Sequence, residues 1–347
     1  MSSPFPLPPP PPPLSSAAGG PKSSAAKKWT VDMGNVLPEI ASLGSAPKAT
    51  ITAQGVEHWD KLVAIKAPSA GSHDTIFVQT EDGVFVVKPD ADAINEKETT
   101  EWLGSLPIDV PKIRLIASSS EEGRQAISEL GKFTGAAKRL SDALTRHNHF
   151  MVMQMVPGQN LDSLQDAGPL TGVGAQTRFF MIGMLVAYDL VIYNIDRFPG
   201  VGDNEGNPGN LMFRSDSEGY NRPIAIDQQI NPANVSVHIE RLKKVLTDPK
   251  HRLSIATKVV LFIKTNTNLP LHPAATERVN DGIREGLVRL AKDNAAEMRA
   301  LGERLESQKM ANGGYGDKQL ELVGATIGLI EKINPDLHQL LMVRDYE

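Results

Sequence analysis

Two aspartates and an asparagine follow a long apolar segment in an order that suits phosphoryl chemistry. Asp196 comes directly after the apolar stretch Phe179 to Ile195, and Asn210 ends a loop rich in glycine, proline and asparagine. Asp227 follows the short apolar run 224–226. Phosphoryl transfer from Mg-ATP needs one carboxylate to orient the acceptor hydroxyl, and an asparagine with a second aspartate to hold the metal ions. We therefore expect Asp196 to be catalytic and Asn210 with Asp227 to ligate Mg²⁺ or Mn²⁺.

Two segments nearer the N-terminus could hold the phosphates of ATP. Lys88 ends the apolar strand 83–87, so its ammonium could reach the α- and β-phosphates and share the catalytic role. The turn 67–73 offers backbone N–H groups and hydroxyls for the same purpose, from Ser69, Gly71 and Ser72. Each feature alone has an ordinary reading, a hairpin turn or a solvated lysine. Their conjunction with the Asp, Asn, Asp order favours a nucleotide site.

A carboxylate on the next helix would position Lys88. The predicted helix from Asp90 to Ser105 carries three candidates, Glu96, Glu98 and Glu101. Glu98 shares a helical stripe with apolar residues, whereas Glu96 points away from it. We therefore predict that Glu98 pairs with Lys88, with Glu101 as the near alternative.

The adenine ring needs an apolar site with backbone groups nearby. The strongly apolar strand 149–156 runs into Pro157-Gly158, where we place the boundary between two lobes. Adenine should pack close to this boundary, beside Met153, Met155 and Val156, and backbone groups should read its edge because these side chains cannot.

Composition limits the partners and the compartment. With 347 residues, 40% of them hydrophobic, the chain is long enough for two lobes. The net charge of -5 and the lack of a long Lys/Arg run argue against nucleic acid or membrane as the main partner. No cysteine occurs, which excludes disulfides and thiolate metal sites. The start shows no leader pattern, and the stretch Phe179 to Ile195 falls short of a membrane span, so we expect a cytoplasmic protein.

The first 28 residues differ from the rest of the chain. They contain six consecutive prolines, Pro8 to Pro13, followed by serine, alanine, glycine and lysine. Such a segment cannot bury enough apolar area to offset its ordering entropy, so residues 1–28 should form a disordered tail. The tail could bind a domain with an aromatic-lined groove for proline-rich ligands, although an ordinary linker is the commoner role.

The remaining residues fall into a β-rich part and an α-rich part. Short apolar runs bounded by turn residues predict strands at 61–65, 74–80, 83–88, 110–118 and 149–156. Helical patterns follow at 90–105, 127–145, 174–194, 235–246, 252–264, 279–308 and 317–343, the last as one helix or two. This order predicts an α+β, two-lobed protein-kinase-like fold, with a small N-terminal lobe at 29–156 and a larger C-terminal lobe at 157–347.

The candidate residues together resemble the protein-kinase-like superfamily. Lys88 and Glu98 resemble its strand lysine and helix glutamate, and Asn194-Ile195-Asp196-Arg197 resembles its catalytic loop. Asn210 and Ile226-Asp227 resemble its metal-binding segments. The forms of these motifs are similar to those of the atypical and phosphoinositide-kinase-like branches.

Essentially all of the folded part, including the loop 202–210, resembles the actin-fragmin kinase catalytic family. The resemblance implies a serine/threonine kinase that phosphorylates a threonine of actin, preferentially in complex with the capping protein fragmin, and that associates with the cytoskeleton. In that family Kelch repeats follow the catalytic domain, so the resemblance also implies that this chain is a fragment.

Several departures from typical kinases leave other functions open. Thirteen residues separate Asp196 from Asn210, where typical kinases have about four. Gln228-Gln229 replaces the usual Phe-Gly, and no Ala-Pro-Glu segment follows. A lipid or small-molecule kinase, or a catalytically weak module that binds the actin complex, therefore stays an alternative. Asp203 in the long insert competes with Asp196 for the role of the base.

Overall fold

The computed structural model describes residues 36–40, 58–67, 75–89, 92–156, 158–172, 174–215, 221–231, 234–292, 295–312 and 317–342. Every described residue belongs to one compact unit, Asn35–Glu347. The predicted tail 1–28, the turn residues Ser69, Gly71 and Ser72, and Pro157 all lie outside the described residues.

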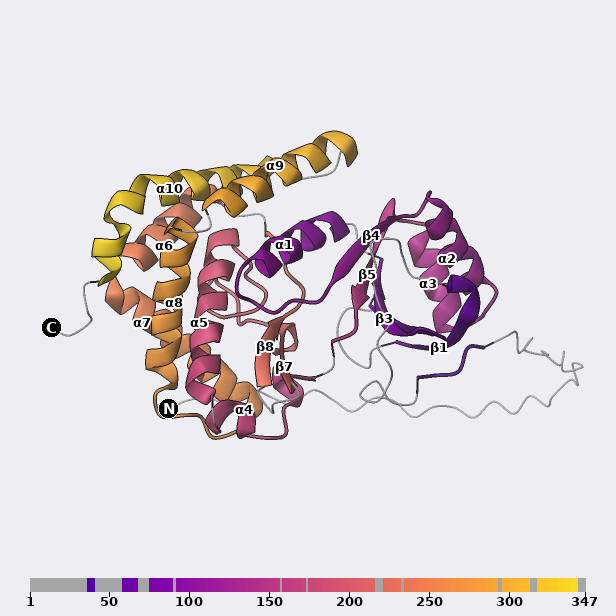
Figure 1. Cartoon of the computed structure of the whole chain (residues 1–347), viewed down its shortest axis with the longest axis horizontal. Coiled ribbons are helices and arrows are strands. Elements are labelled where there is room, and N and C mark those ends of the chain that lie inside the picture. Colours follow the sequence, from indigo (N-terminus) through magenta and orange to yellow (C-terminus); the bar gives the residue numbers. More distant parts are fainter. Residues whose placement is uncertain are drawn as a thin grey trace, which may run out of the picture. The chain divides into compact units, whose positions relative to one another are not determined.

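An antiparallel sheet forms the N-terminal part of the described chain (Figure 1). Its strands run in the order β1-β2-β3-β5-β4, with bounds β1 Leu62–Lys66, β2 Ile76–Thr80, β3 Gly83–Lys88, β4 Ile113–Ala117 and β5 His149–Gln154. The register places Lys88 opposite Met151 and Val86 opposite Met153. Because successive side chains alternate between faces, Lys88 shares one face of the sheet with these residues.

The opposite face of this sheet is covered by α2 (Glu121–Gly131) and α3 (Ala136–Leu144), as Figure 1 shows. Phe85 and Phe150 point into this layer and meet the edge of Trp59, which belongs to η1 (Trp59–Lys61). The prediction of one helix over 127–145 is wrong. Gly135, with a φ of 69°, interrupts the helical backbone and separates α2 from α3.

Helix α1 (Ala93–Ser105) packs on the face that carries Lys88. Ala93 joins Val86, Met151 and Met153 in a small apolar cluster, and α1 contacts β4, β5 and the later helix α9. The side chain of Lys88 therefore ends close to the first turn of α1.

A three-stranded sheet begins the C-terminal part. Its strands are β6 (Gln159–Asn160), β7 (Leu211–Ser215) and β8 (Asn221–Ala225), in that order. Short helices η2 (Leu161–Ser163), α4 (Gly168–Thr171) and η3 (Pro208–Asn210) connect them with α5 (Ala175–Ile192). The pairing of β7 with β8 brings the end of η3 beside the residues that precede Asp227.

Helices complete this part of the chain: α6 (Val235–Thr247), α7 (Pro249–Thr267), α8 (Ala275–Lys292), α9 (Ala295–Asn312) and α10 (Asp317–Met342). The prediction of one helix over 279–308 is wrong, since α8 ends at Lys292 and α9 begins at Ala295, with 293–294 outside the described residues. Two antiparallel sheets and a separate group of packed helices confirm the predicted α+β class. The domain boundaries at 28 and 156 stay predictions.

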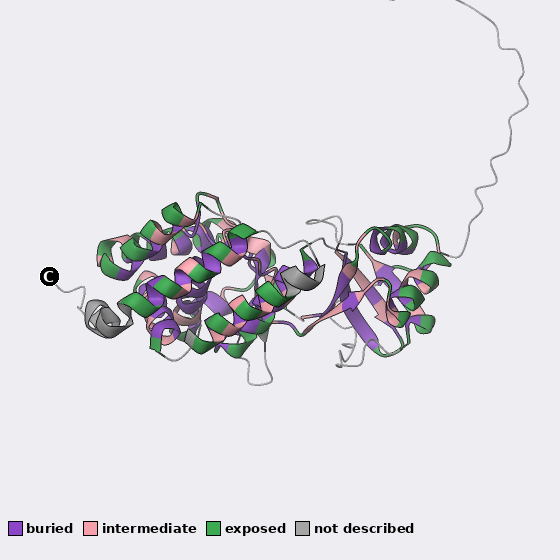
Figure 2. Cartoon of the chain, turned by 90° about the horizontal axis from the view of Figure 1, so that it is seen from above, coloured by how far each residue is buried: buried purple, intermediate pink, exposed green. Residues whose placement is uncertain are grey.

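Helix α5 is the central core element of the helical part. Within the described chain it is the one helix that is long and apolar enough to cross a membrane, but 78% of it is buried inside the protein. Figure 2 shows the buried helical faces turned inward and the exposed faces outward. The apolar character of α5 is therefore explained by the hydrophobic core that surrounds this helix.

Glycines allow α5 and α8 to touch through their backbones. A Cβ on Gly183 would lie 2.1 Å from the carbonyl oxygen of Val279, and a Cβ on Gly282 would lie 2.0 Å from that of Phe180. Real Cβ atoms do not approach oxygen so closely, so any side chain at either position would push the helices apart. This crossing sets the position of α5 and of the loop that follows it.

We predict that Gly282→Ala destabilises the protein by about 3 kcal/mol or more, because the added methyl group forces two packed helices apart. Gly324→Ala is the matched control, since Gly324 lies within α10 with nothing within 4 Å of an added Cβ. This control should be neutral or gain up to about 1 kcal/mol from helix propensity. Urea unfolding curves measure both. Equal stabilities of the two variants would contradict the close crossing.

Candidate active site

Lys88 forms a buried bridge between two carboxylates. Its Nζ donates a hydrogen bond of 2.5 Å to Glu96 Oε2 on α1 and another to Asp227 Oδ1. Lys88 is 7% exposed and Glu96 is fully buried. Burial alone would lower the pKa of Lys88, but Glu96 and Asp227 outweigh that effect and raise the pKa above its ordinary value. The amine therefore carries a positive charge at neutral pH.

The predicted partner of Lys88 is wrong, because Glu96 occupies that position. Glu98 instead accepts hydrogen bonds from Arg304 on α9, at 2.7 Å, and from Lys97, at 3.0 Å. Glu101 pairs with Lys97 at 2.8 Å. Trp102 lies in the apolar stripe that Glu98 shares, and it packs edge-on against Tyr188 of α5. This stripe therefore faces the helical part of the protein.

A tight turn at the end of α5 starts the loop that carries Asp196. Tyr193 adopts a left-handed backbone conformation with a φ of 55°, and the N–H of Asn194 donates to the carbonyl of Asp189. The Asn194 side chain also donates to Asp189 Oδ1, at 3.2 Å. The turn thus leaves the helix in a defined direction, and Asp196 follows two residues later.

Arg197 joins this loop to the other candidate segments from inside the protein. It is fully buried and forms a 2.5 Å ion pair with Asp189 of α5. The same guanidinium donates to the backbone carbonyl of Asn210, at 3.1 Å, and to that of Ile226, at 3.0 Å. Arg197 is therefore the chain neighbour of Asp196, and its side chain contacts Asn210 and the residue that precedes Asp227.

Burial dominates the electrostatics of Asp189. It raises the pKa of this carboxyl group to about 6, while Arg197 and Asn194 act in the opposite direction. Removing Arg197 would leave an unpaired carboxylate at a site with no access to water, which is costly. Arg197 is a residue whose importance the sequence signalled only through its place beside Asp196.

Asp196 and Asn210 meet directly. Asn210 Nδ2 donates to Asp196 Oδ2 at 2.8 Å, and Asn210 is 5% exposed while Asp196 is exposed. The N–H of Ile226 donates to the Asn210 carbonyl at 3.3 Å, which brings Asp227 beside this pair. An exposed carboxylate is thus held by a buried amide at the surface of the protein.

The donor chemistry at this position suits a hard divalent cation. Asp227 has a left-handed backbone, with a φ of 60°, and its side chain is 33% exposed. Carboxylate and amide oxygens are the ligands that Mg²⁺ and Mn²⁺ prefer. Asn210 and Asp227 therefore fit the predicted metal site, although within the described residues no group of three or more His, Cys, Asp or Glu side chains is clustered for a metal.

The competing aspartate lies in a different environment. The side chain of Asp203 is 90% exposed, and it pairs with Arg241 of α6 at 2.7 Å. Its ion-pair partner is on α6, whereas Asn210 and Arg197 hold the segment of Asp196. The geometry groups Asp196 with the other candidates and leaves Asp203 on the surface of the insert.

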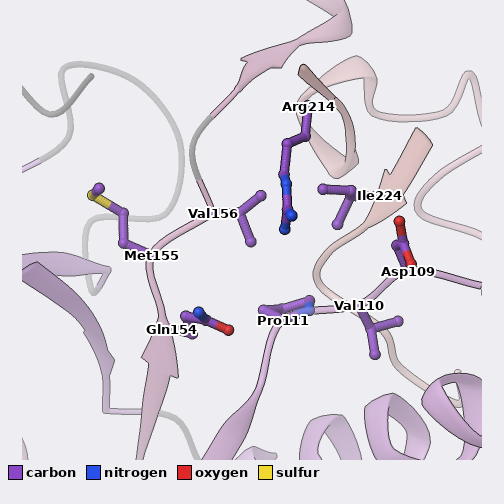
Figure 3. A pocket seen from close by; sticks show the side chains of 8 residues that line it. All are labelled: Asp109, Val110, Pro111, Gln154, Met155, Val156, Arg214 and Ile224. Atoms are coloured by element: carbon purple, nitrogen blue, oxygen red, sulfur yellow. The ribbon is translucent and has the colours of Figure 1, made fainter. Parts of the chain in front are cut away.

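The residues predicted to contact adenine divide between two environments. Met155 and Val156 line a hollow of about 80 Å³ together with Gln154, Arg214 and others, and Figure 3 shows Arg214 extending between Val156 and Ile224. Met153 lies instead in the apolar cluster with Val86. Ligand sites usually measure about 300–1,000 Å³, so this hollow alone does not accommodate a nucleotide. The adenine contacts stay predictions.

Comparison with known families agrees with the predicted resemblance. The family described as "Actin-fragmin kinase, catalytic" matches residues 41–248, more than half of the chain. A protein of Dictyostelium discoideum with the name "Putative actin-fragmin kinase" is 22% identical over 167 residues, which is 45% of this chain and 40% of that protein. The chain thus spans less than half the length of this relative.

Two solved structures are similar at low identity. CtkA, a proinflammatory kinase of Helicobacter pylori, matches with a TM-score of 0.39 and 12% identity, over 78% of this chain and 95% of that chain. HipA, of a toxin–antitoxin complex of Shewanella oneidensis MR-1 with its operator DNA, matches with a TM-score of 0.33 and 10% identity, over 91% of this chain and 70% of that chain.

We predict that Arg197→Lys destabilises the protein by about 2–5 kcal/mol, because lysine keeps the charge but cannot also reach the two backbone carbonyls. Arg241→Lys is the matched control. Arg241 likewise contacts one carboxylate, Asp203, and one carbonyl, that of Val201, but at the surface. Its substitution should cost about 1 kcal/mol or less. Denaturant unfolding measures both, and a similar loss in the two variants would refute the organising role of Arg197.

Proposed function

Because the chain belongs to the actin-fragmin kinase catalytic family, and is thus a kinase-type phosphotransferase, we propose that it transfers the γ-phosphoryl group of ATP to a threonine of actin in the actin–fragmin complex. The observation that carries the proposal is the buried bridge from Glu96 through Lys88 to Asp227. Active protein kinases require a strand lysine paired with a helix glutamate and an aspartate that holds the metal, and the bridge brings these three residue types together.

Asp196 is the proposed catalytic base. Its carboxylate is exposed, so an acceptor hydroxyl can approach it, and the hydrogen bond from Asn210 sets its orientation. In this role one oxygen of Asp196 accepts the hydrogen bond of the acceptor hydroxyl and takes its proton as the phosphoryl group transfers. Arg197, next in the chain, keeps the loop in place through its buried ion pair.

Lys88, Asn210 and Asp227 complete the proposed machinery. Lys88 holds the α- and β-phosphates, for which its ammonium is already charged. Asn210 and Asp227 would hold Mg²⁺ or Mn²⁺, which when bound supplies positive charge that neutralises the triphosphate. The Lys88 contact with Asp227 orients this carboxylate before the nucleotide arrives.

The proposed substrate is based on similarity to known proteins. Support for actin and fragmin as partners comes from the family description and from the name of the Dictyostelium relative. The threonine acceptor and a location at the cytoskeleton are parts of the same proposal. A lipid or a small molecule as acceptor is tested as an alternative outcome of the experiment below.

We predict that the purified chain with Mg-ATP labels actin on threonine, and labels the fragmin complex more strongly than free actin. Phosphoinositide vesicles and small alcohols serve as competing acceptors. The position of labelled γ-phosphate after peptide mapping measures the result. Labelling of a lipid or small molecule without labelling of actin would refute the protein substrate and leave the kinase chemistry standing.

We predict that Asp196→Ala lowers turnover by about 100-fold or more with little change in ATP affinity, because it removes a positioned base. Asp203→Ala is the matched control, in the insert that follows Asp196. It removes an exposed carboxylate paired with Arg241 and should cost far less, mainly through KM for the protein substrate. Steady-state rates at varied ATP and actin measure both variants. The reverse order of losses would move the catalytic role to Asp203.

A further inference from the structure

The position of α1 determines whether Glu96 can pair with Lys88. Glu96 lies in the first turn of α1, and its neighbours Asn95 and Glu98 contact elements from the C-terminal part of the chain. A rigid helix moves as one body, so whatever holds these neighbours also holds Glu96. Two separate sets of contacts do this.

The first set joins α1 to the segment that follows Asp227. The Asn95 side chain donates to the carbonyl of Ile230, at 3.1 Å, and accepts from its N–H, at 3.0 Å. Thr99, one turn later, donates to the same Asn95 oxygen at 3.1 Å. Asn95 is 1% exposed and Thr99 is fully buried, so water cannot replace these bonds.

The second set comes from α9 and α10. Arg304 of α9 donates to Glu98 Oε2 at 2.7 Å, and Glu98 is 2% exposed. Gln319 of α10 donates to the carbonyl of Ile230 at 2.9 Å, the same oxygen that Asn95 contacts. Both helices lie beyond the residues that the family matches. The contacts of α1 and of the Asp227 segment thus converge on Ile230 and on the C-terminal helices.

We propose that Asn95, Arg304 and Gln319 form a latch through which α9 and α10 hold α1 in the position that pairs Glu96 with Lys88. Resting on the proposed function, this makes the three residues positioning residues for phosphoryl transfer, because they act through Lys88 and Asp227. In kinases whose helix at this place is mobile, phosphorylation or a partner protein holds the helix in the active position. Here the C-terminal helices of the same chain hold α1, so the site needs neither.

The alternative is that these contacts only stabilise the fold. A structural role predicts lost stability in the variants without a specific effect on the Lys88–Glu96 pair. A positioning role predicts that the losses in catalysis depend on whether Glu96 is present. This difference defines the experiment.

The first arm measures kcat and KM for ATP. Arg304→Ala should lower kcat/KM for ATP roughly three- to tenfold and Asn95→Ala roughly tenfold or more, with KM for the protein substrate unchanged. Arg299→Ala is the matched control, since Arg299 also lies on α9 and pairs with a glutamate, but that glutamate is Glu331 of α10 and not a residue of α1. It should stay within about twofold of the parent chain.

The double variants separate positioning from stability. Arg304→Ala combined with Glu96→Gln should be no slower than Glu96→Gln alone, within about twofold, because both act through the same pair. If the two losses multiply instead, Arg304 acts independently of Glu96 and the latch is refuted.

The second arm needs no catalysis. Hydrogen exchange of the backbone amides of α1 and of residues 228–231 should be faster in Arg304→Ala and in Gln319→Ala than in the parent chain, and unchanged in Arg299→Ala. Unchanged exchange in all three variants would overturn the proposal. If the parent chain transfers no phosphate to any acceptor, the proposed function fails, while the exchange result still decides whether the latch exists.

Discussion

The buried ion pair between Arg197 and Asp189 is the constraint on which the candidate site depends. Asp189 belongs to the core helix α5, and the Arg197 guanidinium that pairs with it also donates hydrogen bonds to the carbonyls of Asn210 and Ile226. A guanidinium in a dry interior must find acceptors for its N–H groups, and here Asp189 and the backbones of the two segments proposed to bind metal supply them. One desolvated side chain therefore fixes the segments that carry three candidate residues.

The five-stranded sheet and α1 position Lys88, the other charged residue of the candidate site. Alternation along β3 places Lys88 on the face away from α2 and α3, where α1 and Asp227 meet its ammonium. Two carboxylates on one lysine compensate for the loss of water around a buried charge. In the proposed reaction this arrangement has a second use, because a charged lysine oriented in advance loses little entropy when phosphate binds.

The long insert and the C-terminal helices are the features in which this chain differs most from a typical kinase. Thirteen residues separate Asp196 from Asn210, yet the two side chains are in contact, because η3 and β7 return the chain to Arg197. The helices α9 and α10 contact α1 and Ile230. Only residues 228–234 lie between Asp227 and α6, and none of them is serine, threonine or tyrosine. Regulation through a long activation segment is thus replaced, in our proposal, by contacts within the chain.

Local pattern in the sequence predicted the strands around Lys88, the apolar helix before Asp196 and the α+β class, because each depends on periodicity over a few residues. Local pattern did not predict the partner of Lys88. Glu96 and Glu98 lie on the same helix, and only the packing of Trp102 against Tyr188 decided which face meets the sheet. The latch residues Arg304 and Gln319 and the acceptors of Arg197 were equally hidden. They lie far apart in the sequence, and what joins them is the need to satisfy buried polar groups, which only the tertiary structure creates.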